Sequence, residues 1–257
     1  MTHRILASTT SHKRAPLIAS LEVFARLGLS DLDLNLHPFI EGDLSVDAVA
    51  AALRARKQRV WIASGGWCDF FDAAPLAERT FESVGRQVEV STALGAHTLR
   101  LFFGRLPAAA YNQEAGRVLA DNLERLSARH ELTRFVFENH DGASLVPEVC
   151  RDALAKVARP NIRMNFDPIN FARAGVDPER ARATLQPFVS HVHLKGLDRG
   201  EYCEFGTGDV DLTPVLQRLV RDGYDGDFTV EYEGKGDATM FLHESVRRAR
   251  AVVASLV

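Results

Sequence analysis

Cysteine is scarce in this sequence, and long apolar runs are missing from it. Cys68, Cys150 and Cys203 are odd in number, widely spaced and not part of a Cys-x-x-Cys pair. This usage argues against a disulfide framework and predicts reduced thiols. The first residues contain no apolar core of a signal peptide, and no segment approaches the length of a transmembrane helix. We therefore expect a cytoplasmic protein that does not associate with a membrane.

A strong charge imbalance is also absent. The formal net charge is −3, which gives no sign of a surface for nucleic acid. No linker or low-complexity tract interrupts the 257 residues, whose composition, 46% hydrophobic and 25% charged, is ordinary for a globular protein with one large core. We expect no nucleic-acid partner. The oligomeric state stays open, with a homo-oligomer among the alternatives.

Short apolar segments alternate with amphipathic segments along the whole chain. The expected strands are residues 5–8, 32–37, 59–63, 97–104, 134–140, 162–167, 191–196 and 227–234. Each is followed by a segment with helical spacing, as Phe81, Val84 and Val88 show within residues 76–94. Eight such units favour a closed parallel barrel over an open doubly wound sheet, because no glycine-rich dinucleotide loop follows the first strand. The predicted fold is α/β, a single-domain (β/α)8 TIM barrel over residues 1–257.

The segment from His191 to Gly196 separates its polar and apolar residues onto two faces of a strand. His191, His193 and Lys195 share one face, and the residues between them are apolar. The three other strands of the C-terminal half each end in a carboxylate, with apolar neighbours that would face the helices. In such a barrel the active site lies at the carboxyl ends of the strands.

Four ionisable side chains are therefore expected at one end of the barrel: Glu138, Asp167, His193 and Glu231. Two like charges ~4 Å apart repel by roughly 4 kcal/mol at an effective dielectric constant of about 20. Either the pKa values of the three carboxyls rise, or a cation lies among them. One divalent ion would solve the problem, and this oxygen-rich set suits Mn, Mg, Co or Zn. The alternative is four polar residues that are satisfied separately.

Several motifs resemble those of the xylose-isomerase-like TIM-barrel family of sugar and sugar-phosphate isomerases and epimerases, a superfamily that includes endonucleases acting at abasic sites. They are Glu138-Asn139-His140, Asn165-Phe166-Asp167-Pro168-Ile169-Asn170, His191-Val192-His193-Leu194-Lys195, Gly206-Thr207-Gly208-Asp209-Val210-Asp211, Gly223-Tyr224-Asp225-Gly226 and Val230-Glu231-Tyr232-Glu233. The resemblance covers essentially the whole barrel. The motifs together identify the superfamily, but they carry little information about the substrate.

The resemblance implies one divalent metal ion held by Glu138, Asp167, His193 and Glu231. It also implies that Glu138 and Glu231 flank the reacting carbon and move a proton through an enediolate that the metal stabilises. The sequence leaves open which glutamate is the acid and which the base. The implied function is an isomerase or epimerase of a small, carbohydrate-like substrate, a keto-sugar or related polyol ketone. No basic cluster marks a phosphate site, so we expect the substrate to be unphosphorylated.

Other residues are expected to contact the substrate: Arg199, Lys195, His140, Asn170, Asn35, Arg100 and Trp67. Arg199 stands where related epimerases place a substrate-binding arginine, with a solvated loop arginine as the alternative. Lys195 is expected at the rim of the site, and Asn35, His37 and Arg100 on the inward face of the first half. His140 either supports the site or lies free in a loop. His191 is expected to be a hydrogen-bonded core residue and Glu233 to form a salt bridge.

Three other functions compete with this interpretation. A metal-dependent dehydratase or lyase, acting on an inositol- or shikimate-type ketone, would use the same enediolate and then expel a hydroxyl group. A non-catalytic sugar-binding barrel would keep the fold and lose the chemistry. An endonuclease acting at abasic sites is least favoured, because such enzymes need three zinc ions and more histidines. Here Asn170, Trp67 and Phe103 stand where those histidines would be expected.

Overall fold

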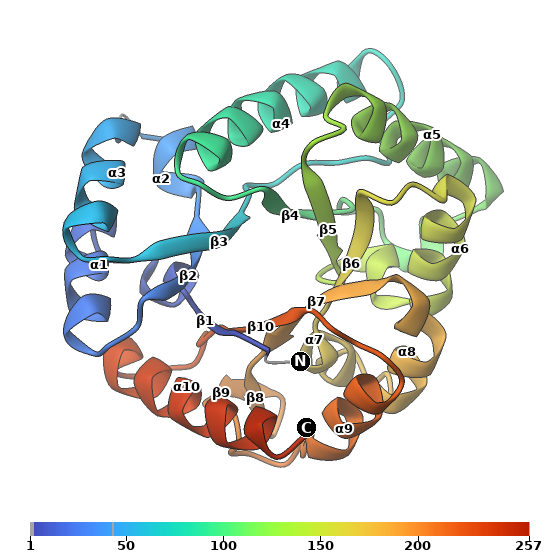
Figure 1. The fold of residues 1–257 in the computed structure, drawn as a ribbon. Coiled ribbons are helices and arrows are strands. Elements are labelled where there is room, and N and C mark those ends of the chain that lie inside the picture. The colour runs from blue at the N-terminus through green and yellow to red at the C-terminus, as the bar shows by residue number, and fades with distance from the viewer. Residues whose placement is uncertain (1–2, 43, 257) are drawn as a thin grey trace.

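The alternating segments form a closed barrel of parallel strands inside a ring of helices (Figure 1). The computed structural model describes residues 3–42 and 44–256. The barrel strands are β1 (Ile5–Ser8), β2 (Asp31–Asn35), β3 (Arg59–Ser64), β4 (Thr98–Phe102), β5 (Arg134–Glu138), β6 (Ile162–Phe166), β7 (Val189–Leu194) and β10 (Asp227–Val230). Their order around the barrel is β1-β10-β7-β6-β5-β4-β3-β2, and β1 closes it by pairing with both β10 and β2. The predicted TIM barrel is confirmed.

Ten α-helices surround the barrel in the described ranges, two more than expected. They are α1 (Leu17–Arg26), α2 (His37–Ile40), α3 (Val46–Ala55), α4 (Leu76–Ala93), α5 (Gln113–Arg129), α6 (Pro147–Val157), α7 (Pro168–Arg173), α8 (Pro178–Leu185), α9 (Thr213–Arg221) and α10 (Ala238–Ala254). The expectation of one helix after each strand is wrong after β2 and β6, where the short helices α2 and α7 come first. Each carries a proline in its first turn, Pro38 and Pro168, where a proline fits a helix.

The early start of α2 corrects the expected second strand. β2 ends at Asn35, so His37 lies outside the barrel, half-exposed, and pairs with Glu41 at 3.0 Å. The expected eighth strand is also shorter, because β10 ends at Val230 and Glu231 follows it directly. An antiparallel hairpin that was not predicted follows β7 and consists of β8 (Gly196–Asp198) and β9 (Glu201–Cys203).

The two faces of the strands carry different residues, and this positions the site. Outward-facing side chains such as Phe137, Phe166 and Val192 pack with the helices in one continuous core. Inside the barrel, Leu6, Ile62 and Val136 form a separate, small apolar cluster. The remaining interior is polar, because the strands end in ionisable side chains.

The described residues also contain four 3-10 helices, at Thr9–His12, Ala108–Ala110, Gly142–Leu145 and Gln186–Phe188. No described helix is both long enough and apolar enough to cross a bilayer. All three cysteines are free thiols, as expected.

Candidate metal centre

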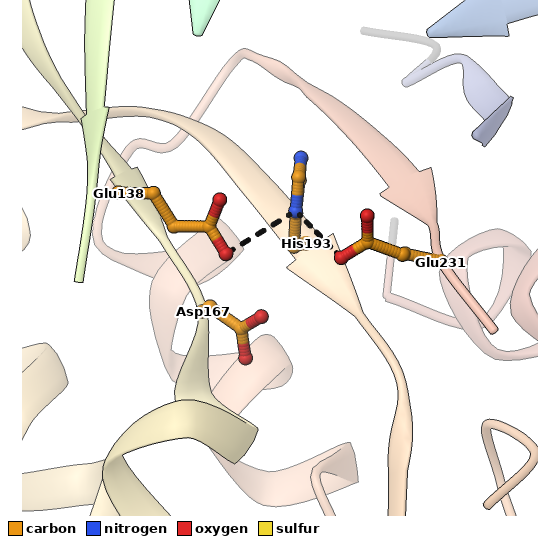
Figure 2. A group of neighbouring side chains, drawn as sticks. All are labelled: Glu138, Asp167, His193 and Glu231. Atoms are coloured by element: carbon orange, nitrogen blue, oxygen red, sulfur yellow. Dashed lines mark ion pairs between the residues drawn. The ribbon is translucent and has the colours of Figure 1, made fainter. Parts of the chain in front are cut away.

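The four expected ligands come together at the carboxyl ends of their strands, as Figure 2 shows. Glu138 is the last residue of β5, Asp167 follows β6 directly, His193 lies near the end of β7, and Glu231 follows β10 directly. Each offers one ligand atom, and these atoms all lie within 4.8 Å of one another. All four side chains are buried. We refer to these residues below as the ligand cluster.

Asp167 is oriented by the backbone around it. Its Oδ1 accepts hydrogen bonds from the backbone N–H groups of Ile169 and Asn170, both at 2.9 Å, and so caps α7. The Asn139 side chain bonds both the N–H and the carbonyl of Asp167. Because Oδ1 is committed to the helix, Oδ2 is the oxygen that can serve as a ligand.

His193 is buried, and no described residue forms a hydrogen bond with its ring. Its Nδ1 lies 3.7 Å from Glu138 Oε1 and 3.6 Å from Glu231 Oε2, beyond the range of a good hydrogen bond. Within the described residues neither ring nitrogen has a hydrogen-bond partner. An unpartnered imidazole nitrogen between carboxylates fits a divalent cation, since three carboxylates and one imidazole suit Mg, Mn, Co or Zn.

The pKa values reflect the charges enclosed here. Burial lowers the pKa of His193, but Glu138, Asp33 and Glu231 outweigh burial and raise it to about 10. Burial raises the pKa of the Asp167 carboxyl to about 6, although Lys195 opposes the rise. Burial also raises the pKa values of Glu138 and Glu231, but the surrounding cations outweigh it and lower both. The two glutamates are therefore ionised at neutral pH.

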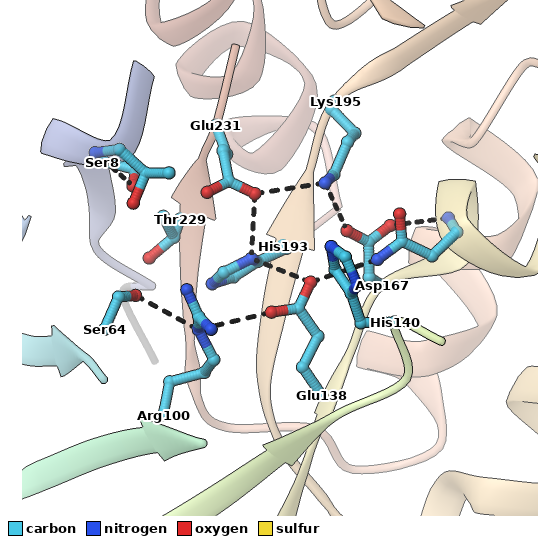
Figure 3. Close-up of polar contacts among 12 residues, drawn as sticks. Ser8, Ser64, Arg100, Glu138, His140, Asp167, His193, Lys195, Thr229 and Glu231 are labelled. Atoms are coloured by element: carbon cyan, nitrogen blue, oxygen red, sulfur yellow. Dashed lines mark hydrogen bonds and ion pairs between the residues drawn. The ribbon is translucent and has the colours of Figure 1, made fainter. Parts of the chain in front are cut away.

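Lys195 is buried against the ligand cluster, so the prediction that it lies at the rim of the site is wrong. The side chain is fully buried, and its Nζ is 3.0 Å from Asp167 Oδ2 and 3.1 Å from Glu231 Oε2 (Figure 3). The same Nζ is 2.7 Å from Glu233 Oε2. The physical reason is that three carboxylates attract the ammonium group into the barrel, whereas a position at the rim would leave it in solvent. The predicted salt bridge of Glu233 is thereby confirmed.

Arg100 and Asn170 hold the Glu138 carboxylate rather than lying apart from it. Arg100 Nε is 3.3 Å from Glu138 Oε2, and Figure 3 shows the two side chains facing each other. Asn170 Nδ2 donates to Glu138 Oε1 at 3.1 Å. The amide oxygen of Asn170 accepts from the hydroxyl of Tyr202, which lies on β9 and was missed in the sequence. A direct contact of Arg100 or Asn170 with substrate stays a prediction.

Aromatic side chains lie beside Glu138. Trp67 stacks on Phe102 with ring centroids 4.4 Å apart, and the His140 ring meets both edge-on at 5.3 and 4.8 Å. Trp67 is 42% exposed, so it stands at the surface of this group. His140 also pairs with Asp141 at 3.2 Å. Of the two alternatives for His140, the packed position matches a supporting residue better than a free loop residue.

Two other residues expected to bind substrate contact residues outside the ligand cluster. Arg199 lies in the turn between β8 and β9 with a φ of 48°, its side chain 87% exposed and paired with Asp198. Asn35 accepts a hydrogen bond from the backbone N–H of His37 at the start of α2. Their contact with substrate stays a prediction.

One functional candidate, Asp33, was not predicted from the sequence. Asp33 is fully buried, and its Oδ2 lies 3.4 Å from His193 Nε2. The signal was the alternation of residues 32–36, which puts Asp33 on the inward face.

The prediction for His191 is confirmed, because its Nε2 bonds Thr229 Oγ1 at 2.8 Å one layer below the cluster.

Two named proteins are similar to this chain in sequence. The 3-dehydroshikimate dehydratase of Bacillus anthracis is 23% identical over 141 residues, which cover 52% of this chain and 50% of that protein. A Mus musculus protein provisionally named hydroxypyruvate isomerase is 28% identical over 181 residues, which cover 64% of each chain. The chain thus spans between half and two-thirds of the length of these two relatives.

Solved structures show the same fold at low identity. The 3-keto-D-glucoside 4-epimerase YcjR from E. coli superposes with a TM-score of 0.76 at 16% identity, covering 97% of this chain and 100% of that chain. The IOLI protein, solved with a bound zinc atom, gives a TM-score of 0.80 at 16% identity over 99% and 98%. The profile described as xylose isomerase-like TIM barrel matches residues 21–255. The chain therefore belongs to the xylose isomerase-like TIM barrel family.

Proposed function

We propose that this protein is a divalent-metal-dependent isomerase or epimerase of a small keto-sugar or related polyol ketone. The observation that carries the proposal is the ligand cluster, in which Glu138 and Glu231 approach from opposite sides of His193 (Figure 2). Two ionised carboxylates facing each other across a site can remove and return a proton. The similarity to an isomerase, an epimerase and a dehydratase supports the same class of chemistry.

Glu138, Asp167, His193 and Glu231 would hold the metal ion, Mn, Mg, Co or Zn. When bound, a divalent ion polarises a carbonyl group and stabilises the negative charge that develops next to it. Asp167 would serve only as a ligand, through Oδ2, because its other oxygen caps α7. His193 would serve as a ligand through Nδ1. The two glutamates are left as the groups that could move a proton.

The two glutamates differ in how their oxygens are held. Glu138 has Arg100 beside one oxygen and Asn170 bonded to the other. Glu231 is bonded by Lys195 through Oε2 alone, and no hydrogen bond from the described residues reaches its Oε1. We therefore assign Glu231 Oε1 as the base that removes the proton next to the carbonyl. Glu138, after taking up a proton from solvent, returns it to the substrate from the other side, and Glu231 releases the proton it has removed to solvent.

A dehydratase is the second candidate, and the 3-dehydroshikimate dehydratase similarity is the observation that favours it. The same base would remove the same kind of proton, and a hydroxyl group on the neighbouring carbon would then leave as water. Proton removal is common to both reactions. The two reactions differ in the next step, which is return of a proton in an isomerase or epimerase and loss of water in a dehydratase.

Exchange of the substrate proton with solvent tests the proposal. The Mn²⁺-loaded protein is incubated in deuterated buffer with unphosphorylated ketoses and with inosose- and dehydroshikimate-type ketones, and NMR follows the proton next to each carbonyl. We expect exchange with at least one ketose, accompanied by an isomer or epimer. Loss of water from a cyclic ketone would assign a dehydratase instead. No exchange with any ketone, together with no metal by elemental analysis, would overturn the proposal.

Metal affinity is expected to rise with pH. Binding at His193 Nδ1 displaces the proton that a pKa of about 10 keeps there at neutral pH. Below about pH 6 the Asp167 carboxyl also has to lose its proton. The Kd for Mn²⁺ should therefore fall about tenfold per pH unit near neutrality, and more steeply in acid. Competition with a chelator between pH 5 and 8 measures this, and a pH-independent Kd would contradict it.

A further inference from the structure

A chain of buried polar contacts runs below the ligand cluster and returns to it. It starts at His193 Nε2, which lies 3.4 Å from Asp33 Oδ2. The other Asp33 oxygen accepts a hydrogen bond from Ser64 Oγ at 2.7 Å. Arg100 Nε donates to the same Ser64 oxygen at 3.2 Å and lies beside Glu138, as Figure 3 shows. Two of the four metal ligands are thus joined through β2, β3 and β4.

Asp33 reaches His193 across the interior of the barrel. In the sheet β2 pairs with β1 and β3, whereas β7 pairs with β6 and β10, so no backbone ladder joins the two residues. Both side chains are fully buried. Asp33 Oδ2 and His193 Nε2 each lack a hydrogen-bond partner elsewhere in the described residues. Two unpartnered buried polar atoms that face each other indicate a paired role, since an isolated one is costly.

We infer that Asp33 is a positioning residue that fixes the tautomer of His193 for metal binding. A neutral imidazole carries one N–H and one lone pair. The lone pair is needed at Nδ1, which faces Glu138 and Glu231, so the proton must lie on Nε2. An ionised carboxylate only accepts, and Asp33 therefore selects this tautomer and holds the ring. The inference rests on the proposed metal centre.

Ser64 sets the direction of the hydrogen bond to Asp33. Because Arg100 Nε donates to Ser64 Oγ, the single hydroxyl proton of Ser64 is free to point at Asp33 Oδ1. In an Asp33→Asn variant the amide oxygen must stay on the Ser64 side to accept this proton. The amide NH₂ then faces His193 Nε2 and forces that nitrogen to accept. The imidazole proton moves to Nδ1, where it blocks the lone pair that the metal needs.

The affinity for Mn²⁺ tests the inference without any measurement of turnover. We expect Asp33→Asn to raise the Kd for Mn²⁺, measured by calorimetry on the full chain, about 10- to 100-fold. Asp31→Asn is the matched control, because Asp31 lies on the same strand and accepts from Trp61 Nε1, which an asparagine oxygen can still do. Its Kd should equal that of the wild type.

A double variant separates tautomer control from structural damage. Ser64→Ala in the Asp33→Asn background frees the amide to turn its oxygen toward His193, so we expect the Kd to recover toward the wild-type value. Damage to folding would not be repaired by a second truncation. Asp33→Asn binding Mn²⁺ as tightly as wild type, or no recovery in the double variant, would overturn the inference alone. A wild type that binds no Mn²⁺ would overturn the metal centre and this inference with it.

Discussion

Replacing Glu231 with glutamine is expected to slow proton exchange at the substrate carbon by about 10²- to 10⁴-fold, the usual contribution of a positioned acid or base. The carboxylate of Glu231 is buried, its pKa is held well below the usual range, and its Oε1 has no hydrogen bond from the described residues. Glutamine keeps the size and a ligand oxygen but cannot take up the proton. The rate of deuterium incorporation measures the effect, with metal content determined in parallel.

Glu233→Gln is the control for this variant. Glu233 is also a glutamate bonded to Lys195, but it lies outside the ligand cluster. We expect its exchange rate to stay near that of the wild type. If Glu138→Gln abolishes exchange and Glu231→Gln does not, the roles of the two glutamates are reversed. If neither variant slows exchange while metal is retained, the glutamates are not the acid and base.

Replacing Lys195 with methionine is expected to destabilise the fold by about 3–5 kcal/mol, because it removes one partner of a buried charge network. Burial lowers the pKa of Lys195, but Asp167, Glu231 and Glu233 outweigh burial and raise it, so the group is charged. Without its ammonium group, three carboxylates would remain close together with less compensation. Denaturant unfolding in the presence of a chelator measures the loss, and added Mn²⁺ should restore part of it.

Lys13→Met is the matched control for the lysine variant. Lys13 pairs with the same Glu233, at 3.5 Å, but its side chain is 57% exposed. Exposed ion pairs contribute about 0–1 kcal/mol, so the control should unfold at nearly the wild-type denaturant concentration. Equal losses in the two variants would show that burial of Lys195 does not govern its contribution.

The barrel and the ligand cluster could be predicted from the sequence because both follow from a local pattern. Alternation over four to eight residues decides which side chains face inward, and parallel strands bring their carboxyl ends to one edge. Glu138, Asp167, His193 and Glu231 each end such a segment, and the structure places their ligand atoms together. The short helices α2 and α7 escaped prediction because a proline after a strand either ends a strand or starts a helix.

The tertiary structure decided which polar groups face one another. Lys195 follows the strand that carries His193, and the sequence does not show that carboxylates from two other strand ends converge on its ammonium group. Asp33 was visible as an inward residue of β2, but its partner His193 lies across the barrel on β7. Periodicity determines the face on which a side chain lies, because it is a property of neighbouring residues. The pairing of distant side chains depends on how the closed barrel aligns its strands, and only the folded chain supplies that.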